Sequence, residues 1–178
     1  MNSRLKITSR FKAFLILGIC GIMAGSCFKM RYSTTGASIP AEARTFSVQY
    51  FENMAQTVEA GLSQQVTDAL KDYIQGSTNL ILVTGTGDVD FEGTIAAYEP
   101  GRPVAITSGD EAAKNRFTIA IKVKFNCDVK PELNFESTFS RYEDYSSDID
   151  FESVKDTMTE EILRLLIQDI FNRAFVNW

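Results

Sequence analysis

The sequence predicts an α+β fold, a two-layer sandwich in which a mixed sheet of four to five strands carries two helices packed on one face. Two patterns point to this class. Several stretches alternate apolar and polar residues with a period of two, as half-buried strands do, and two stretches repeat apolar residues every three or four positions, as amphipathic helices do. Their order along the 178 residues is β-α-β-β-β-β-α, which suits a single domain.

The first predicted unit is a strand, a helix and a second strand. Residues 45–51 alternate, and the side expected to be buried consists of Phe46, Val48 and Tyr50. The apolar face of the following helix consists of Val58, Leu62, Val66, Ala69, Leu70 and Tyr73. Asn53 is a candidate N-cap of this helix, Gly61 falls inside it, and Gly76 is a candidate for its C-cap. The apolar run 80–83 then predicts a buried strand parallel to the first, because a helix connects the two.

The next strands follow one another without a helix. Residues 89–97 alternate, and residues 117–125 give the clearest strand of the chain. Its buried face is expected to hold Phe117, Ile119, Ile121, Val123 and Phe125. Residues 133–142 predict its hairpin partner. On the exposed faces of these two strands, opposite charges can pair, namely Lys122 or Lys124 with Glu136.

A long helix closes the predicted fold, from about Ser153 to Phe175. Ser153 and Asp156 have the spacing of a capping box, with Asp in place of the usual Glu. Apolar residues cover a wide arc in the second half of this helix. We therefore expect that half to be buried on more than one side, or to meet a partner.

Charge is distributed unevenly along the chain. The whole chain carries a net charge of −5. Its first 26 residues hold no acidic residue and four basic ones, Arg4, Lys6, Arg10 and Lys12, which leaves −9 on the remainder. An uncharged apolar run, residues 13–24, follows these basic residues. This layout predicts a secretory signal peptide over residues 1–26, with an N-terminal membrane anchor or a buried helix as alternatives.

Small residues precede Cys27, as in the lipobox of bacterial lipoproteins, although Ala24 stands where Leu is most common. We expect lipidation of Cys27, a lipidated tether over residues 27–43 and a folded domain over residues 44–178. The alternative is ordinary signal cleavage that leaves Cys27 as a free thiol. Cys127 ends an apolar strand and is expected to be structural.

The composition argues against catalysis. The chain has no histidine, so it holds no Ser–His or Cys–His nucleophile pair and no histidine metal site. We predict no catalytic residues, no metal and no cofactor. Asp88, Asp90 and Glu92 alternate along one strand; a site for a hard cation and an ordinary solvated face are both consistent with that spacing. The net negative charge also argues against a nucleic-acid partner.

Several blocks of the sequence are similar to a known family. They are Cys27, residues 35–40, the strand 46–51 with Glu52 and Asn53, the block 134–142 and the ending 169–178. With these residues the chain resembles the lipopolysaccharide-assembly lipoprotein LptE, in its Bacteroidetes-type form. The resemblance implies a lipid-anchored protein on the periplasmic side of the outer membrane. Such a protein plugs the LptD β-barrel, assists assembly of that barrel and helps to insert lipopolysaccharide into the outer leaflet.

The resemblance also implies contact with lipopolysaccharide through basic residues near loops or strand ends. Arg102, Lys114 and Arg116 flank the predicted loop 99–110 and are the candidates; solvated loop charges are the alternative. A different function is a periplasmic-facing lipoprotein that binds a lipid or small molecule without a barrel partner, which would require a deep apolar pocket between sheet and helices. A secreted scaffold or adhesion module is a third hypothesis.

Overall fold

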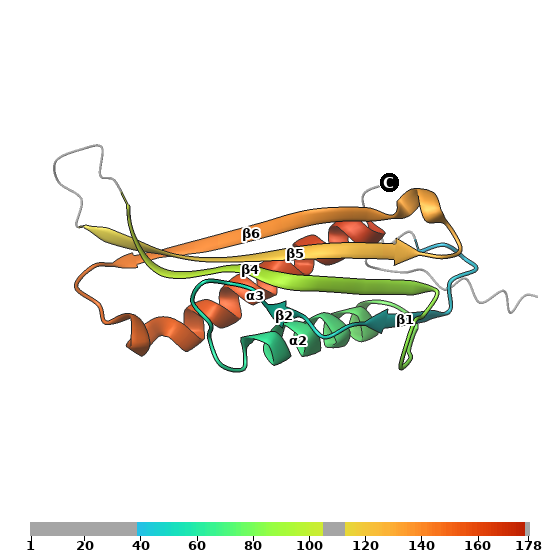
Figure 1. Cartoon of the computed structure of the whole chain (residues 1–178), viewed down its shortest axis with the longest axis horizontal. Helices are drawn as coiled ribbons and strands as arrows, with labels where there is room; N and C mark the ends of the chain where they lie inside the picture. The colour runs from blue at the N-terminus through green and yellow to red at the C-terminus, as the bar shows by residue number, and fades with distance from the viewer. Residues whose placement is uncertain (1–38, 105–112, 177–178) are drawn as a thin grey trace, which may run out of the picture. The chain divides into compact units, whose positions relative to one another are not determined.

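The computed structural model describes residues 39–104 and 113–176. The predicted signal peptide 1–26 and Cys27 lie outside these residues. Residues 28–38 of the predicted tether and residues 105–110 of the predicted loop also lie outside them. The described elements are β1 (Thr45–Val48), β2 (Glu52–Asn53), α2 (Leu62–Ser77), β3 (Ile81–Leu82), β4 (Val89–Val104), β5 (Lys114–Cys127), the 3₁₀ turn η1 (Pro131–Leu133), β6 (Phe135–Ser146) and α3 (Phe151–Phe175). Figure 1 shows β4, β5 and β6 as three long neighbouring strands.

The strands form one mixed sheet of six, in the order β3-β1-β4-β5-β6, with β2 beside β4. β1 runs parallel to both β3 and β4, whereas β5 is antiparallel to its two neighbours, β4 and β6. The predicted class is confirmed, and the strand count is slightly higher than expected. The reason is that the predicted strand 45–51 is shortened to β1, and the additional short strand β2 forms just after it and pairs with β4 farther along.

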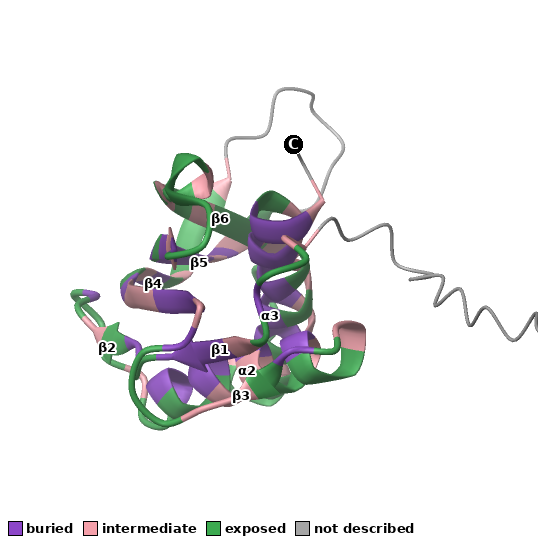
Figure 2. Ribbon diagram, turned by 90° about the vertical axis from the view of Figure 1, so that its right-hand side faces the viewer, coloured by how far each residue is buried: buried purple, intermediate pink, exposed green. Residues whose placement is uncertain are grey.

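Both helices lie on the same face of the sheet. α2 packs against the short strands β1, β2 and β3, while α3 packs against β5 and β6. Figure 2 shows the buried sides of β1, β4 and α3 turned toward one another. The largest side chains between the layers are completely buried, among them Phe46, Phe91, Phe117, Phe125 and Phe175. Burial of this apolar surface is the main stabilising contribution to the fold.

The prediction that Tyr50 faces the core is wrong. Its side chain is 58% exposed, and Phe51 is buried in its place. β1 ends at Val48, so the alternation that we extrapolated to residue 50 no longer applies. The chain then turns inward, and the backbone N–H of Phe51 donates to the hydroxyl of Thr67 on α2.

The start of α2 also differs from the prediction. Gly61 is not inside the helix but forms its N-cap, with a φ of 80° that favours glycine. Val58 therefore lies outside the helix and is 69% exposed. Asn53 does not cap the helix; its side-chain oxygen accepts from the N–H of Ala55. At the other end Gly76 is helical, and Thr78 is the C-cap.

β4 is much longer than expected. Glu99 was predicted to begin a loop, yet the strand continues to Val104 through Pro100 and Pro103. Proline is tolerated here because β1 and β2 pair only with the first part of β4, so this end of the strand has β5 alone as its neighbour. Two irregularities, at Ile95/Ala97 and Glu99/Arg102, interrupt the register with β5, and the second of them contains Pro100.

The predictions for β5 and α3 are largely confirmed. All five predicted core residues of β5 are buried. β6 starts at Phe135, because the residues before it form the turn η1, and it runs beyond the predicted end to Ser146. α3 begins at Phe151 with Asp150 as its N-cap. The predicted capping box is wrong, since the hydroxyl of Ser153 donates to the backbone carbonyl of Asp150 instead.

Candidate functional site

The three predicted basic residues come together at one end of the sheet. Arg102 of β4 lies directly opposite Arg116 of β5, and Lys114 is opposite Val104, two pairs farther along. Phe117 points into the core, so its neighbour Arg116 points to the opposite face, away from the helices. Residues opposite each other in an antiparallel pair share a face, which places all three cations on the outer face of the sheet.

The two arginines differ in how firmly they are held. The guanidinium of Arg116 donates to both carboxylate oxygens of Asp144 on β6, at 2.7 and 3.0 Å, and lies 3.6 Å from the centre of the Tyr142 ring. The hydrogen bonds from Arg116 hold the pKa of Asp144 below its ordinary value. The side chain of Arg102 is 75% exposed and lies 3.9 Å from Glu99. Arg116 is thus fixed in place, and Arg102 is available to a ligand.

A shallow groove of about 480 Å³ adjoins these cations on the outer face. Ala97, Ala120 and Ser140 line it, from three neighbouring strands. Because these side chains are small, they leave room above the sheet, and Arg102 and Arg116 lie at the end of the groove. We call the surface formed by Arg102, Lys114, Arg116 and Tyr142 at this end of the groove the basic sheet end. Its chemistry suits an anionic group, since guanidinium donates two parallel hydrogen bonds to phosphate or carboxylate.

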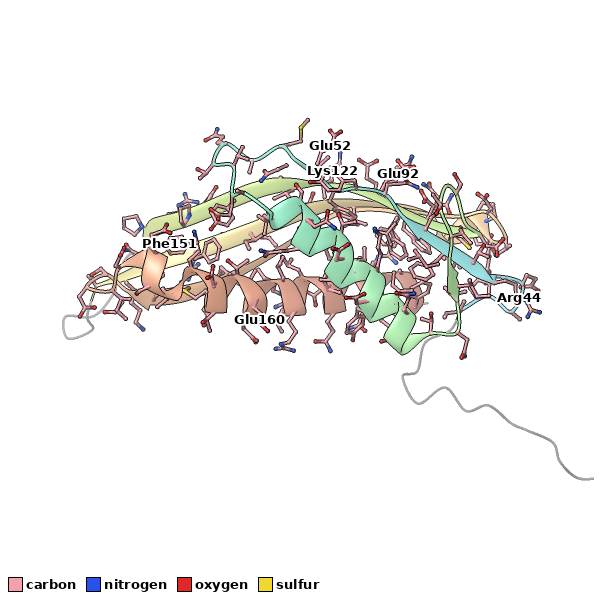
Figure 3. The ribbon with its side chains drawn as sticks, turned by 90° about the horizontal axis from the view of Figure 1, so that it is seen from below. Arg44, Glu52, Glu92, Lys122, Phe151 and Glu160 are labelled. Atoms are coloured by element: carbon pink, nitrogen blue, oxygen red, sulfur yellow. The ribbon has the colours of Figure 1, made fainter. Side chains whose placement is uncertain are left out.

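The middle of the outer face carries charges of both signs. Lys122 forms an ion pair with Glu136 at 2.5 Å, which confirms the predicted cross-strand pairing. Lys124 pairs instead with Glu92 on its other side, at 3.3 Å. Figure 3 shows Lys122, Glu92 and Glu52 projecting from the same side of the molecule, opposite α3. This part of the sheet is therefore polar and close to electrically balanced.

The acidic residues near the start of β4 have structural roles. Asp90 is 4% exposed, so it does not belong to a solvated face. Asp88 precedes the strand, and its carboxylate accepts from the N–H groups of Arg44 and Thr45 and from the Thr45 hydroxyl. Among residues 39–104 and 113–176, no group of three or more acidic or cysteine side chains could hold a metal ion. Cys127 is a free thiol in the core, as predicted.

Sequence reasoning identified the cations but missed Asp144, which fixes one of them. The two tyrosines near these cations on β6, Tyr142 and Tyr145, have different surroundings. The hydroxyl of Tyr145 donates a hydrogen bond to the carbonyl of Pro100, whereas the side chain of Tyr142 is 56% exposed beside Arg116. The period of two along β6 was the available signal, because it puts Tyr142 and Asp144 on the same face as Glu136.

The fold and this surface define a class of protein: an α+β domain that presents a polar sheet face with a basic end. In the part of the chain that the structure describes, no helix is long and apolar enough to cross a membrane. Residues 43–174 match the family model of LptE, described as lipopolysaccharide-assembly, and the chain belongs to this family. Among curated proteins, none matches the chain in sequence.

Solved structures are similar to this chain at low sequence identity. A hypothetical protein from Chlamydia trachomatis is 8% identical with a TM-score of 0.50, over 76% of this chain and 99% of that one. A protein from Xanthomonas campestris is 12% identical with a TM-score of 0.50, over 76% and 87% of the two chains. A minor lipoprotein from Acinetobacter baumannii is 11% identical with a TM-score of 0.49, over 74% and 91%.

Proposed function

We propose that this protein is an outer-membrane lipoprotein on the periplasmic side that plugs an LptD-like β-barrel and assists its assembly. In that position it helps to insert lipopolysaccharide into the outer leaflet. The single observation that carries the proposal is the family match over residues 43–174, which covers nearly all of the described domain. The surface of the domain adds physical detail to this role.

The outer face of the sheet is suited to the inside of a barrel. The interior of a transmembrane β-barrel is polar, so a plug has to present polar and charged groups to it. The middle of the sheet offers paired charges, Lys122 with Glu136 and Lys124 with Glu92. Paired charges limit the desolvation penalty when such a face approaches a polar wall.

The basic sheet end is the proposed contact for lipopolysaccharide. Lipid A carries phosphate groups, and Arg102 and Lys114 are exposed cations that can bind them. Arg116 would contribute through its fixed position beside Tyr142. The net charge of the whole chain is −5, so attraction of an anionic lipid has to be local to this surface.

Anchoring would come from lipidation of Cys27, which lies outside the described residues. Replacement of Cys27 by Ala should abolish incorporation of radioactive palmitate. The matched control is Cys127→Ala, which removes a buried thiol and should leave the label unchanged. Label retained in the Cys27 variant would refute an anchor at this position.

The alternative, a lipoprotein that binds a lipid or small molecule without a barrel, requires a deep apolar pocket between sheet and helices. The described core gives this no support. Side chains from both layers, such as Phe91 of the sheet and Ile170 of α3, are fully buried. The interior between the layers is filled by these side chains, and we retain the barrel plug as the proposed function.

Two experiments test the proposal. Protein extracted from membranes with a mild detergent should co-purify with a large outer-membrane barrel in equal amounts; a single partner-free species would contradict the plug. For the lipid contact, Arg102→Glu with Lys114→Glu should lower the affinity for purified lipopolysaccharide by roughly tenfold or more. Lys130→Glu, in the loop at the opposite end of β5, is the matched control and should have little effect.

A further inference from the structure

The surface between the two helices carries a second feature, on the side of the molecule opposite to the basic sheet end. α2 and α3 run side by side, with Glu59 close to Lys155 at one end and the rings of Tyr73 and Phe171 in contact at the other. Between them lies a groove of about 610 Å³ that opens to solvent. Figure 3 shows α2 and α3 below the sheet, with Glu160 labelled on α3.

The floor of this groove is apolar. It is formed by Ala69 and Tyr73 of α2 and by Leu163 and Ile167 of α3. Leu163 and Ile167 belong to the wide apolar arc that the sequence shows in the second half of α3. The sheet and α2 leave Leu163 and Ile167 only 5% and 2% exposed, so the partly exposed Ala69 and Tyr73 form the accessible part of the floor.

The rim of the groove is acidic. Asp72 lies on the α2 side, and Asp156 and Glu160 lie on the α3 side. All three are exposed, and within the described residues none of them forms an ion pair. The two cations on the rim are already neutralised: Lys155 by Glu59 and Glu152, and Arg164 by Glu161. The charge that remains for a ligand is negative.

We propose that the groove between α2 and α3 binds a cationic amphipathic helix of a partner protein. The apolar face of that helix would pack on the partly exposed Ala69 and Tyr73, above Leu163 and Ile167, and its basic residues would meet Asp72, Asp156 and Glu160. The lining spans residues 155–167 of α3, about 18 Å at 1.5 Å per residue, which is slightly more than three turns of helix.

The charge of the rim also excludes the ligand assigned to the other face. A phosphorylated lipid would bring negative charge to a rim that is already negative, which is unfavourable. This inference therefore goes beyond the proposed function and involves a different surface. It can fail while the barrel and lipopolysaccharide experiments succeed, and the reverse also holds.

The test uses the full chain in nanodiscs of zwitterionic lipid and a fluorescent synthetic helix of about 15 residues, with leucine on one face and lysine on the other. A second peptide of the same pattern has glutamate in place of lysine. The lysine peptide should bind saturably above empty nanodiscs, and its affinity should fall with added salt. The glutamate peptide should not bind. Failure of the lysine peptide to bind, or equal binding of both peptides, would overturn the proposal.

Two pairs of variants locate the binding. Asp156→Lys with Glu160→Lys should weaken binding by roughly tenfold, whereas Asp128→Lys with Glu132→Lys, in the loop after β5, should not. Ala69→Trp fills the groove and should weaken binding to a similar degree. Its control, Gln64→Trp, adds the same side chain to an exposed position of α2. Unchanged affinity in both groove variants, with native circular dichroism, would place the peptide elsewhere and contradict the proposal.

Discussion

The hydroxyl of Ser47 on β1 donates a hydrogen bond to the carboxylate of Asp90 on β4, inside the protein. The two residues are 1% and 4% exposed. Gln49 donates to the same carboxylate at 2.8 Å, and the N–H of Gly87 donates to the Ser47 oxygen at 2.9 Å. This small network joins the parallel pair β1 and β4 at a point where the sheet has only short strands on one side.

Removal of the Ser47 hydroxyl should therefore destabilise the fold. Ser47→Ala leaves a buried carboxylate with one donor fewer, which costs about 1–3 kcal/mol of unfolding free energy. Urea unfolding followed by circular dichroism measures the difference. Ser140→Ala removes an exposed hydroxyl and is the control. Equal midpoints for the two variants would mean that the Ser47 hydroxyl contributes nothing to stability.

A methyl group at Gly93 should disrupt the contact between β4 and β5. An added Cβ would collide with the backbone carbonyl of Lys122 and with the ring of Phe51, and a backbone atom cannot move aside cheaply. Gly93→Ala is expected to lower stability by about 1–3 kcal/mol, as other overpacked sites do. At Gly101 the same methyl would meet only the Tyr145 hydroxyl at 3.6 Å. Gly101→Ala should leave the thermal midpoint nearly unchanged; a similar loss in both variants would refute the explanation.

Asp88 should make stability depend on acid pH. The backbone N–H groups of Arg44 and Thr45, and then the Thr45 hydroxyl, hold the pKa of Asp88 below its ordinary value of 3.8. A lowered pKa in the folded state means that the stabilisation is present above pH 3.8 and is lost as the pH falls through the lower, folded-state value. Asp88→Asn should thus be less stable than the parent protein at pH 7.

The difference between the two proteins should shrink as the pH falls from about 4 toward 2, because the parent carboxyl is then protonated as well. Unfolding by urea at a series of pH values measures this. Asp148→Asn, at an exposed loop position, is the control and should give a constant small difference. A gap between Asp88→Asn and the parent that widens on acidification would contradict the assignment.

Cys127 should be unreactive in the folded protein. Burial is the main reason why the pKa of its thiol is raised, so little thiolate forms at neutral pH and reagents have no access to it. Iodoacetamide should leave the peptide containing Cys127 unmodified in the native protein and alkylate it fully in urea, as measured by mass spectrometry. Rapid alkylation without denaturant would show that β5 opens at its end.

The sequence located features that depend on neighbours along the chain. The alternation in β5 correctly identified the buried residues from Phe117 to Phe125, because side chains on a strand change face at every residue whatever the strand pairs with. The pattern could not place Tyr50, Gly61 or the end of β4. Each of these depends on where a strand ends or a helix begins, and contacts elsewhere in the fold determine those boundaries.

The basic sheet end shows most clearly which features follow from the sequence and which follow only from the tertiary structure. By itself the sequence determined that Arg102, Lys114 and Arg116 are basic residues flanking one segment, and that β5 and β6 form a hairpin. Only the tertiary structure decided that Arg102 lies opposite Arg116, that Asp144 and Tyr142 hold Arg116, and that α2 and α3 leave an acid-rimmed groove between them. The physical reason is that local periodicity fixes which face a side chain occupies, whereas its neighbours on that face follow from strand register, irregularities and helix packing between residues far apart in the chain.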